Sequence, residues 1–234
     1  MPYIYWVTLV LRFLGLGYVL LGLWLGNQWL AEQPDSNKFW KPLNPDSPIG
    51  WFTKTKVMAL QNNPEQCHAF LQRAGVDFTP LSDRQAGQCQ LHEQTLLKQS
   101  NYRYSATVKG TCPLIAALVL WEKQVVAPAA ETHLASPIRS IAHYGIFACR
   151  NVRGSGRRSQ HATANAIDIA AFTTESGQTI RITRDWEADT QNGAFLHQIH
   201  RQSCALFRGA LGPDYNAAHH DHFHFDLGRF SFCR

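Results

Sequence analysis

The sequence predicts an α+β fold, in which a small antiparallel sheet with flanking helices follows an N-terminal transmembrane helix. Two patterns point to this fold: apolar helical segments concentrate in the first half of the chain, and short strands that carry polar side chains concentrate in the second half. The 234-residue chain is also 45% hydrophobic and 17% charged, which is enough apolar material for a packed core. This composition excludes disordered, collagen-like and low-complexity classes.

The first thirty residues are apolar, and their only charged side chain is Arg12. A spanning helix needs about 20 apolar residues, and residues 13–30 reach that length if Asn27 and Gln28 lie in the far headgroup region. A charge at mid-bilayer costs roughly 2.5–3.5 kcal/mol, so we expect Arg12 at the cytoplasmic edge. We therefore expect a single-pass anchor over residues 1–30 in the inner, cytoplasmic membrane, with the rest of the chain in the periplasm or outside the cell. A cleaved signal peptide is the alternative, although no Ala-x-Ala site precedes Pro34.

Six cysteines lie beyond this anchor, and no two of them form a CxxC pair. This spacing argues against a zinc ribbon or a thioredoxin-like site and favours disulfides formed in an oxidising compartment. Reduced core thiols are the alternative, but they would suit a cytosolic protein. We expect sequential pairing: Cys67–Cys89, Cys112–Cys149 and Cys204–Cys233.

Residues 31–50 contain four prolines and show no hydrophobic periodicity, so we expect an extended linker there and the domain over residues 51–234. Prolines at first turns and a glycine after the last turn indicate the helix ends. On this basis helices are expected within residues 57–72 and at 113–125 and 192–207. Short strands are expected at residues 138–142, 144–149, 166–172, 179–182 and 220–227. Residues 91–97 and 102–108 are expected to form short strands or irregular pieces.

The net charge is +5, from 22 Lys and Arg against 17 Asp and Glu, and no basic run exceeds the pair Arg157 and Arg158. This pattern excludes a nucleic-acid footprint. A mild positive charge suits an anionic polymer such as a cell wall, or the outer face of a membrane.

The densest chemical signal is the run His-His-Asp-His-Phe-His-Phe-Asp-Leu at residues 219–227. Side chains alternate along a strand, so one face is expected to carry Asp221 and an apolar set that packs on a helix: Phe223, Phe225 and Leu227. Packing does not explain the opposite face, which would carry His220, His222, His224 and Asp226. Imidazoles in a row suit a divalent metal if a further ligand comes from elsewhere.

A second element lies about sixty residues upstream, where His161 precedes Asp168 by seven positions with small residues between them. Small side chains let the chain turn tightly, and Asp168 interrupts an apolar strand, where an unpaired carboxylate would be costly to bury. Two histidines and one carboxylate with an open fourth position are typical of a catalytic zinc site. The alternatives are a solvated strand edge, a core carboxylate bonded to backbone amides, and adventitious metal binding.

Together these residues form the pattern H-x6-D followed by H-x-H, which resembles the zinc peptidases of the lysostaphin, D-alanyl-D-alanine carboxypeptidase and hedgehog group. The local sequence is most similar to the extensin-like C-terminal domain family, over roughly residues 67–233. The similar stretches are residues 144–150, 159–162, 165–169, 195–204, 211–216 and 219–224.

The resemblance implies one zinc ion per chain, held by His161, Asp168 and His224. It implies that His222 faces the substrate as general base or electrostatic clamp, and that His219 assists. The implied fold is that of hedgehog domains and D-Ala-D-Ala metallopeptidases, and the implied substrate is a peptide cross-link or stem peptide of peptidoglycan. A cell-wall or partner-binding module that keeps the zinc site without turnover is the alternative.

One departure from the carboxypeptidase branch concerns the general base. In that branch a glutamate shortly before the last histidine supplies the base, but no glutamate follows Glu187 in this chain. The base would then be His222, oriented by Asp221 or Asp226, and the departure favours an endopeptidase.

Three side chains that precede His161 in the sequence are candidates for substrate binding. Arg150 and Arg158 can hold a peptide carboxylate by bidentate contacts, or they belong to a solvated basic loop. Ser159 bonds the substrate or starts a turn. The sequence carries no signal for the oligomeric state.

Overall fold

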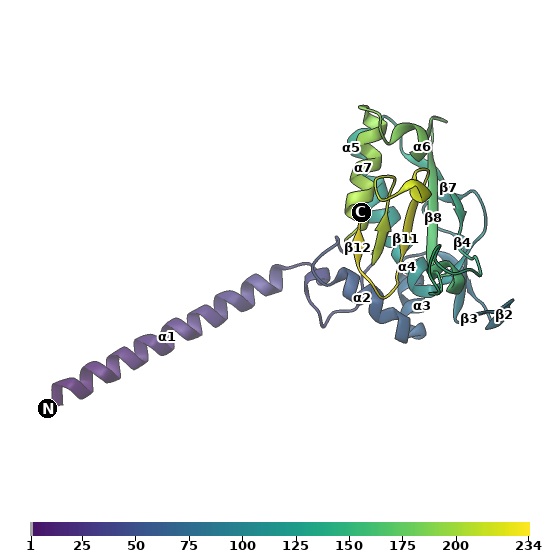
Figure 1. Cartoon of the computed structure of the whole chain (residues 1–234). Helices are drawn as coiled ribbons and strands as arrows, with labels where there is room; N and C mark the ends of the chain where they lie inside the picture. The colour runs from purple at the N-terminus through teal and green to yellow at the C-terminus, as the bar shows by residue number, and fades with distance from the viewer. Residues whose placement is uncertain (1) are drawn as a thin grey trace.

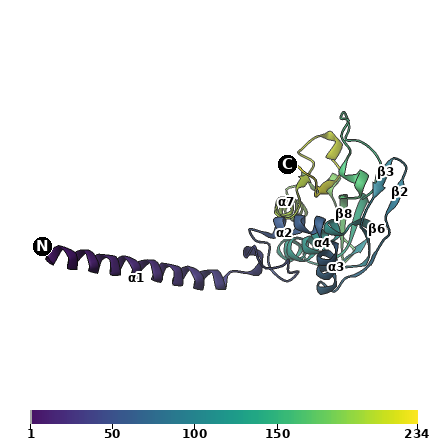
Figure 2. The same ribbon diagram turned by 90° about the horizontal axis from the view of Figure 1, so that it is seen from below.

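Helix α1 (Pro2–Glu32) projects away from the rest of the chain in the computed structural model, which describes residues 2–234 (Figures 1 and 2). Its side chains are exposed along most of its length, although nearly all of them are apolar. The helix is long and apolar enough to cross a membrane, and a signal sequence at the N-terminus has the same character. This element is therefore a single-pass membrane anchor or a signal sequence, as its composition predicts.

The segment that follows α1 lies against the domain. It contains a short 3-10 helix, η1 (Asp35–Asn37), and the buried side chains of Leu43 and Pro45. The Arg73 guanidinium donates a hydrogen bond to the Leu43 carbonyl at 3.1 Å. The prolines keep long regular structure out of this segment, as the linker prediction requires, but the core contact of Leu43 orders it on the domain.

A continuous helical path forms the centre of the domain. It runs through α4 (Cys112–Trp121), a π-helical turn η3 (Glu122–Val126) and α5 (Ala127–His133). Every side chain of α4 is buried. The sequence predicts that this helix ends at residue 125, ahead of Pro128, which lacks an N–H donor. The path continues because the wider π turn precedes Pro128, which then lies in the first turn of α5, where no donor is needed.

The remaining helices cover this centre. Helix α3 starts at Pro64, as predicted, where the Asn63 side chain accepts a hydrogen bond from the Gln66 N–H. The predicted helix over residues 192–207 forms as α7, although it ends earlier. The bounds are α2 (Thr53–Ala59), η2 (Leu60–Asn62), α3 (Pro64–Arg73), α6 (Ile182–Asp185) and α7 (Gln191–Ser203).

The main sheet has the strand order β12-β10-β11-β8-β7-β5, and β9 pairs with β8 beside this path. Its central pairings are antiparallel, as predicted, while β10 with β12 and β5 with β7 are parallel. The strands are β5 (Arg103–Tyr104), β7 (Ile138–Gly145), β8 (Ala166–Thr174), β9 (Thr179–Arg181), β10 (Gly209–Leu211), β11 (Phe223–Asp226) and β12 (Phe232–Cys233). The structure thus has the predicted α+β character.

Two smaller β elements complete the domain. An antiparallel sheet has the order β1-β4-β6, and β2 and β3 form a hairpin. Their strands are β1 (Asp77–Pro80), β2 (Arg84–Ala86), β3 (Cys89–Leu91), β4 (Gln94–Gln99) and β6 (Val108–Thr111). The short strands or irregular pieces expected over residues 91–97 form the end of β3 and the start of β4, because the chain turns at Glu93, whose φ is 48°.

Two predicted strands of the main sheet also differ in extent. Strand β7 runs through to Gly145, and the chain then leaves the sheet, so the predicted strand over residues 144–149 is mostly loop. The predicted strand over residues 220–227 shortens to β11, because a short 3-10 helix, η5 (Ala217–His219), precedes it. His220 therefore lies outside the strand.

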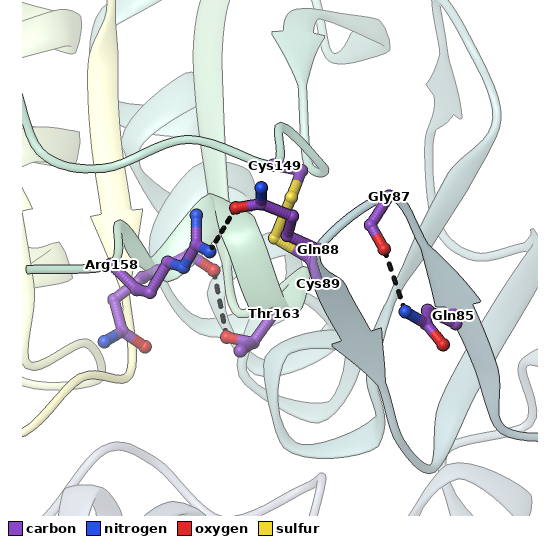
Figure 3. The surroundings of a disulfide bond; sticks show 8 residues. Gln85, Gly87, Gln88, Cys89, Cys149, Arg158 and Thr163 are labelled. Carbon is purple, nitrogen blue, oxygen red and sulfur yellow. Dashed lines mark hydrogen bonds between the residues drawn. A yellow bond between two sulfur atoms is a disulfide. The ribbon is translucent and has the colours of Figure 1, made fainter.

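The six cysteines form the disulfides Cys67–Cys112, Cys89–Cys149 and Cys204–Cys233. The predicted pair Cys204–Cys233 is confirmed, and the other two predicted pairs, Cys67–Cys89 and Cys112–Cys149, are wrong. Helix packing explains the difference, because Cys67 lies on α3, which packs against α4, where Cys112 is the first residue. Cys89 of the β2–β3 hairpin is then bonded to Cys149 in the loop after β7 (Figure 3).

The core joins the helical path to the main sheet through aromatic side chains. Trp121 of α4 lies 6.0 Å from Phe172 and 5.6 Å from Phe225, measured between ring centroids. Phe207 stacks on Phe225 at 4.8 Å. Phe223, Phe225 and Leu227 are all buried, so the predicted apolar face of the last histidine-rich strand is confirmed.

Candidate metal centre

The pairing of β8 with β11 places Asp168 and His224 directly opposite each other. Because side chains alternate along strands, both residues point to the face of the sheet that their neighbours do not occupy. Those neighbours are fully buried in the core: Ile167, Ile169, Phe223 and Phe225. Two strands with apolar residues on one face thus present a carboxylate and an imidazole side by side on the other face.

The third group, His161, comes from the 3-10 helix η4 (Gln160–Thr163). Ser159 caps this helix, because its Oγ accepts a hydrogen bond from the His161 N–H at 3.3 Å. Ala164 then adopts the left-handed conformation, with a φ of 53°, and turns the chain into β8. The predicted tight turn between His161 and Asp168 is therefore confirmed. Ser159 starts this turn, which is one of its two predicted roles.

Three possible ligand atoms converge between these elements. His161 Nε2 lies 3.2 Å from Asp168 Oδ1 and 3.1 Å from His224 Nδ1. His224 Nδ1 lies 2.9 Å from Asp168 Oδ1. A tetrahedral zinc site with bonds of about 2.0–2.1 Å separates its ligand atoms by about 3.3 Å. The group therefore fits a divalent cation after small outward shifts of its members, and its three ligands would leave the fourth position open.

Each imidazole of this group is oriented by a hydrogen bond from its other ring nitrogen. His161 Nδ1 lies 2.9 Å from the Ile146 carbonyl, which can only accept, so the proton is on Nδ1 and the Nε2 lone pair faces the centre. His224 Nε2 donates to Asp226 Oδ2 at 3.0 Å, which leaves Nδ1 facing the centre. Such partners fix the tautomer and the ring orientation of metal-binding histidines.

Asp226 is itself held rigidly. Its side chain is buried, and its Oδ1 accepts a hydrogen bond from the Gly228 N–H at 2.6 Å. A Cβ at Gly209 would collide with the Asp226 carboxylate, so this position of β10 requires glycine. From the sequence alone, Asp221 and Asp226 are both candidates to orient His222, the expected base. Asp226 orients His224 instead.

The charges at the centre favour a cation. Burial opposes ionisation of Asp168, but the adjacent imidazoles of His161 and His224 outweigh it and hold the Asp168 pKa well below its usual range. Burial also disfavours a charged His224, but hydrogen bonds with Asp168 and Asp226 outweigh it and raise the His224 pKa to about 9. Without a metal, the centre therefore holds a carboxylate beside an imidazolium, and a bound cation would replace the proton on His224 Nδ1.

His222 lies beside the three possible ligands but is oriented separately. Its Nε2 is 3.6 Å from Asp168 Oδ1, and its Nδ1 is 2.8 Å from Asp221 Oδ1. The Asp221 carboxylate accepts the proton on Nδ1, so the Nε2 lone pair is free on the side of the centre. Of the two predicted orienting residues, Asp221 is the one that contacts His222.

His219 packs against this group from η5. Its ring centroid lies 5.2 Å from that of His222 and 5.9 Å from that of His224, and its Nδ1 is 2.8 Å from Asn216 Oδ1. Burial and the neighbouring histidines lower the His219 pKa to about 4, so this imidazole is neutral at pH 7.

His220, predicted to share a face with His222 and His224, does not join them. Its side chain is exposed, and its Nδ1 lies 2.9 Å from the Ala217 carbonyl. The 3-10 helix before β11 breaks the strand alternation on which that prediction depends.

The two predicted substrate-binding arginines lie in the loop between β7 and η4. The Arg158 guanidinium donates to Gln88 Oε1 at 3.3 Å, beside the Cys89–Cys149 disulfide (Figure 3). This contact ties the loop to the β2–β3 hairpin. Arg150 is exposed, and its positive charge contributes to the lowered pKa of His219, so Arg150 lies on the histidine side of the loop.

Sequence reasoning missed Tyr144 and Asn216. The Tyr144 ring packs edge-on at 5.8 Å from His222, and its pKa is raised by burial and by the adjacent Asp221. Tyr144 is 60% exposed, so it borders the open side of the centre. The pairing of β7 with β8 would have indicated it, and the Asn-Ala-Ala-His sequence is a helix-capping pattern that would have indicated Asn216.

The profile of the family described as Extensin-like protein C-terminus matches residues 65–234. Searches of curated proteins and of solved structures return no match. The matched span begins within α3 and contains every member of the candidate metal centre and all six cysteines. It covers well over half of the chain, and the protein therefore belongs to the extensin-like C-terminal family.

Proposed function

We propose that this protein is an exported zinc metallopeptidase that hydrolyses peptide cross-links or stem peptides of peptidoglycan. The observation that carries the proposal is the convergence of His161, Asp168 and His224 beside a separately oriented imidazole, His222. The resemblance of these residues to the lysostaphin, D-Ala-D-Ala carboxypeptidase and hedgehog group supports a peptidase-like fold and this substrate class. The apolar α1 and the three disulfides support an extracytoplasmic domain, for which we propose the periplasm.

His161, Asp168 and His224 would hold one zinc ion per chain. When bound, this ion would act as a Lewis acid that acidifies water and polarises the scissile carbonyl. His161 and His224 are suited to this role because each is held in the required tautomer by Ile146 or Asp226.

His222 is the proposed general base. Its Nε2 would accept a proton from the attacking water, while Asp221 holds the ring and stabilises the imidazolium that forms. The protonated His222 would then donate this proton to the leaving amine. The absence of any glutamate after Glu187 removes the usual base of the carboxypeptidase branch and favours endopeptidase action.

Other groups would position the substrate. His219, neutral at pH 7 and bonded to Asn216 through Nδ1, offers its Nε2 lone pair to a substrate N–H. Arg150 and Tyr144 lie at the exposed border, where each can donate to a peptide carboxylate or carbonyl. The hydrogen bond of Arg158 with Gln88 favours a structural role for this arginine.

The test is digestion of purified sacculi by the zinc-loaded full chain in detergent, with the released muropeptides identified by mass spectrometry. His222→Ala is expected to keep about one zinc per chain and to lose cleavage by at least about 100-fold. His220→Ala is the matched control, because this neighbouring histidine is exposed and bonded to Ala217. Cleavage by the His222→Ala variant would reject the assigned base. A wild-type protein that holds zinc but never cleaves sacculi would instead be a wall-binding module.

A further inference from the structure

Exposed aromatic side chains gather where α1 joins the domain. We call Trp29, Phe39, Trp40 and Trp51 the aromatic collar. Their side chains are 52%, 70%, 52% and 65% exposed. Trp29 of α1 contacts Trp51 of the domain with ring centroids 6.1 Å apart, and Phe39 lies 5.0 Å from Trp40. Large apolar rings left in water are unfavourable, and tryptophan is enriched where one side of a ring meets lipid and the other meets water.

The collar is fixed to α1 and to the domain by hydrogen bonds. The Asn37 side chain donates a hydrogen bond through Nδ2 to Gln33 Oε1 at 3.0 Å. Its Oδ1 accepts a hydrogen bond from the backbone N–H of Trp51 at 2.9 Å. Lys38 donates to the carbonyl of Ala31 at 2.9 Å.

Two further observations show that this junction is built tightly. Lys56 of α2 donates to the Asp35 carbonyl at 2.6 Å. A Cβ at Gly50 would collide with Asn37 and Ser36, so the chain approaches itself too closely there for any other residue. Because the junction is ordered, the position of α1 in a bilayer would determine how deep the collar lies in that bilayer.

The length of α1 then sets that depth. At about 1.5 Å per residue, the segment over residues 13–30, which is apolar except for Asn27 and Gln28, is about 27 Å long, close to the roughly 30 Å thickness of the hydrocarbon core. With Arg12 at one surface of the bilayer, Trp29 lies at the other surface. Trp51 contacts Trp29, so it lies at the same level. Lys38, Lys41 and Lys54 adjoin the collar in the sequence, against Glu32 and Asp35, and leave a small excess of positive charge, which favours anionic lipid headgroups.

We propose that the aromatic collar lies in the headgroup region of a phospholipid bilayer and seats the domain on the membrane surface. The proposal takes α1 as a retained span and does not depend on catalysis. The domain would then be held in one orientation at the membrane, and the candidate metal centre would be presented at a fixed height above it.

A single reporter on the full chain tests this proposal. All six cysteines are in disulfides, so among residues 2–234 there is no free thiol, and one introduced cysteine can be labelled with the environment-sensitive dye NBD. The labelled positions are Trp40→Cys and, as a second collar position, Phe39→Cys. The control is Tyr215→Cys, an exposed aromatic whose ring packs on His219 instead. Each variant is reconstituted in vesicles of phosphatidylcholine and phosphatidylglycerol, with or without lipids that carry a nitroxide quencher near the headgroup.

Both collar labels are expected to emit at shorter wavelength than the control and to be quenched several-fold more strongly by the nitroxide lipids. Equal and weak quenching at positions 39, 40 and 215 would overturn the proposal. Cleavage of the exported protein between Trp29 and Phe39, detected as a shortened mass, would also overturn it. Because the readout is fluorescence, failure of the proposed peptidase activity leaves this result unaffected.

Discussion

His224 donates its Nε2 proton to Asp226, two residues further along the same strand, at 3.0 Å. This hydrogen bond decides which ring nitrogen faces the candidate metal centre. It also fixes the ring plane, because Asp226 is buried and bonded in turn to the Gly228 N–H.

Asp226→Asn should weaken zinc binding by about 10–100-fold, because a neutral amide holds the His224 ring less firmly and lowers its basicity. The measurement is competition against a zinc chelator of known affinity, with the full chain in detergent. Glu187→Gln, a charge-neutralising change at an exposed position, is the control. An unchanged zinc affinity in Asp226→Asn would contradict the orienting role of the carboxylate.

Zinc binding should release about one proton per ion at pH 7. The His224 pKa is about 9 without a metal, so this imidazole is protonated at pH 7, and the proton on Nδ1 must leave when a cation binds. Zinc affinity should therefore rise by up to about tenfold per pH unit until the pH approaches 9. Calorimetric titrations in buffers of different ionisation enthalpy measure the released proton. Release close to zero would contradict a His224 that is protonated at pH 7 and gives up its Nδ1 proton to the cation.

Asp221→Asn should slow cleavage by about 10–100-fold while leaving the zinc content unchanged. The Asp221 carboxylate contacts Nδ1 of His222, and Asp221 is not among the three possible metal ligands. The substitution should therefore lower the turnover rate and leave zinc binding unchanged. Muropeptide release and zinc content are measured on the same sample. A loss of zinc together with activity would indicate that Asp221 supports the ligands rather than the base.

The disulfide pairing can be read by mass spectrometry of an unreduced digest. Linked peptides should join Cys67 to Cys112 and Cys89 to Cys149, whereas a Cys67–Cys89 peptide would contradict the structure. Replacing both Cys89 and Cys149 by alanine should lower the free energy of unfolding by about 2–5 kcal/mol, because the bond closes a long loop, with its cysteines 60 positions apart. Chemical denaturation of the oxidised proteins gives this difference.

Glu122 should make the protein less stable as the pH rises from about 4.5 to about 7. Burial raises its pKa to about 7, against hydrogen bonds from Tyr104, Ser100 and Asn101, whereas the unfolded chain ionises near 4.5. The unfolded state therefore binds fewer protons in this window, and the free energy of unfolding falls by up to about 3 kcal/mol.

The measurement for Glu122 is the pH dependence of unfolding in the wild type and in Glu122→Gln. The variant should lose this slope, because its amide does not titrate, whereas Glu187→Gln at the surface should keep it. An identical slope in wild type and Glu122→Gln would show that another group is responsible.

The site was more predictable from sequence than its surroundings. Asp168 within an apolar strand and His224 between two phenylalanines follow from local alternation, and the structure places both beside His161. What sequence could not show is the register that sets Asp168 opposite His224, because register depends on contacts between distant strands.

The errors arise where a helix cap, a π-helical turn or a tertiary contact overrides the simple sequence pattern. His220 would follow the strand alternation, but the capping of η5 by Asn216 starts the strand later. The cysteine pairs depend on which helices pack together, and spacing carries no information on that. Pro128 usually ends a helix, yet the π-helical turn before it lets the path continue.

Strand register also limits how the chain can vary in length. Asp168 and His224 belong to different strands, and the chain between them leaves the sheet through α6 and α7 before it returns. Deleting one residue ahead of His224 within β11 would carry its imidazole through to the buried side and destroy the candidate metal centre. Extra residues inserted in the exposed turn between α6 and α7 would leave both strands in place. We therefore expect this turn to accept a change of length that β11 does not.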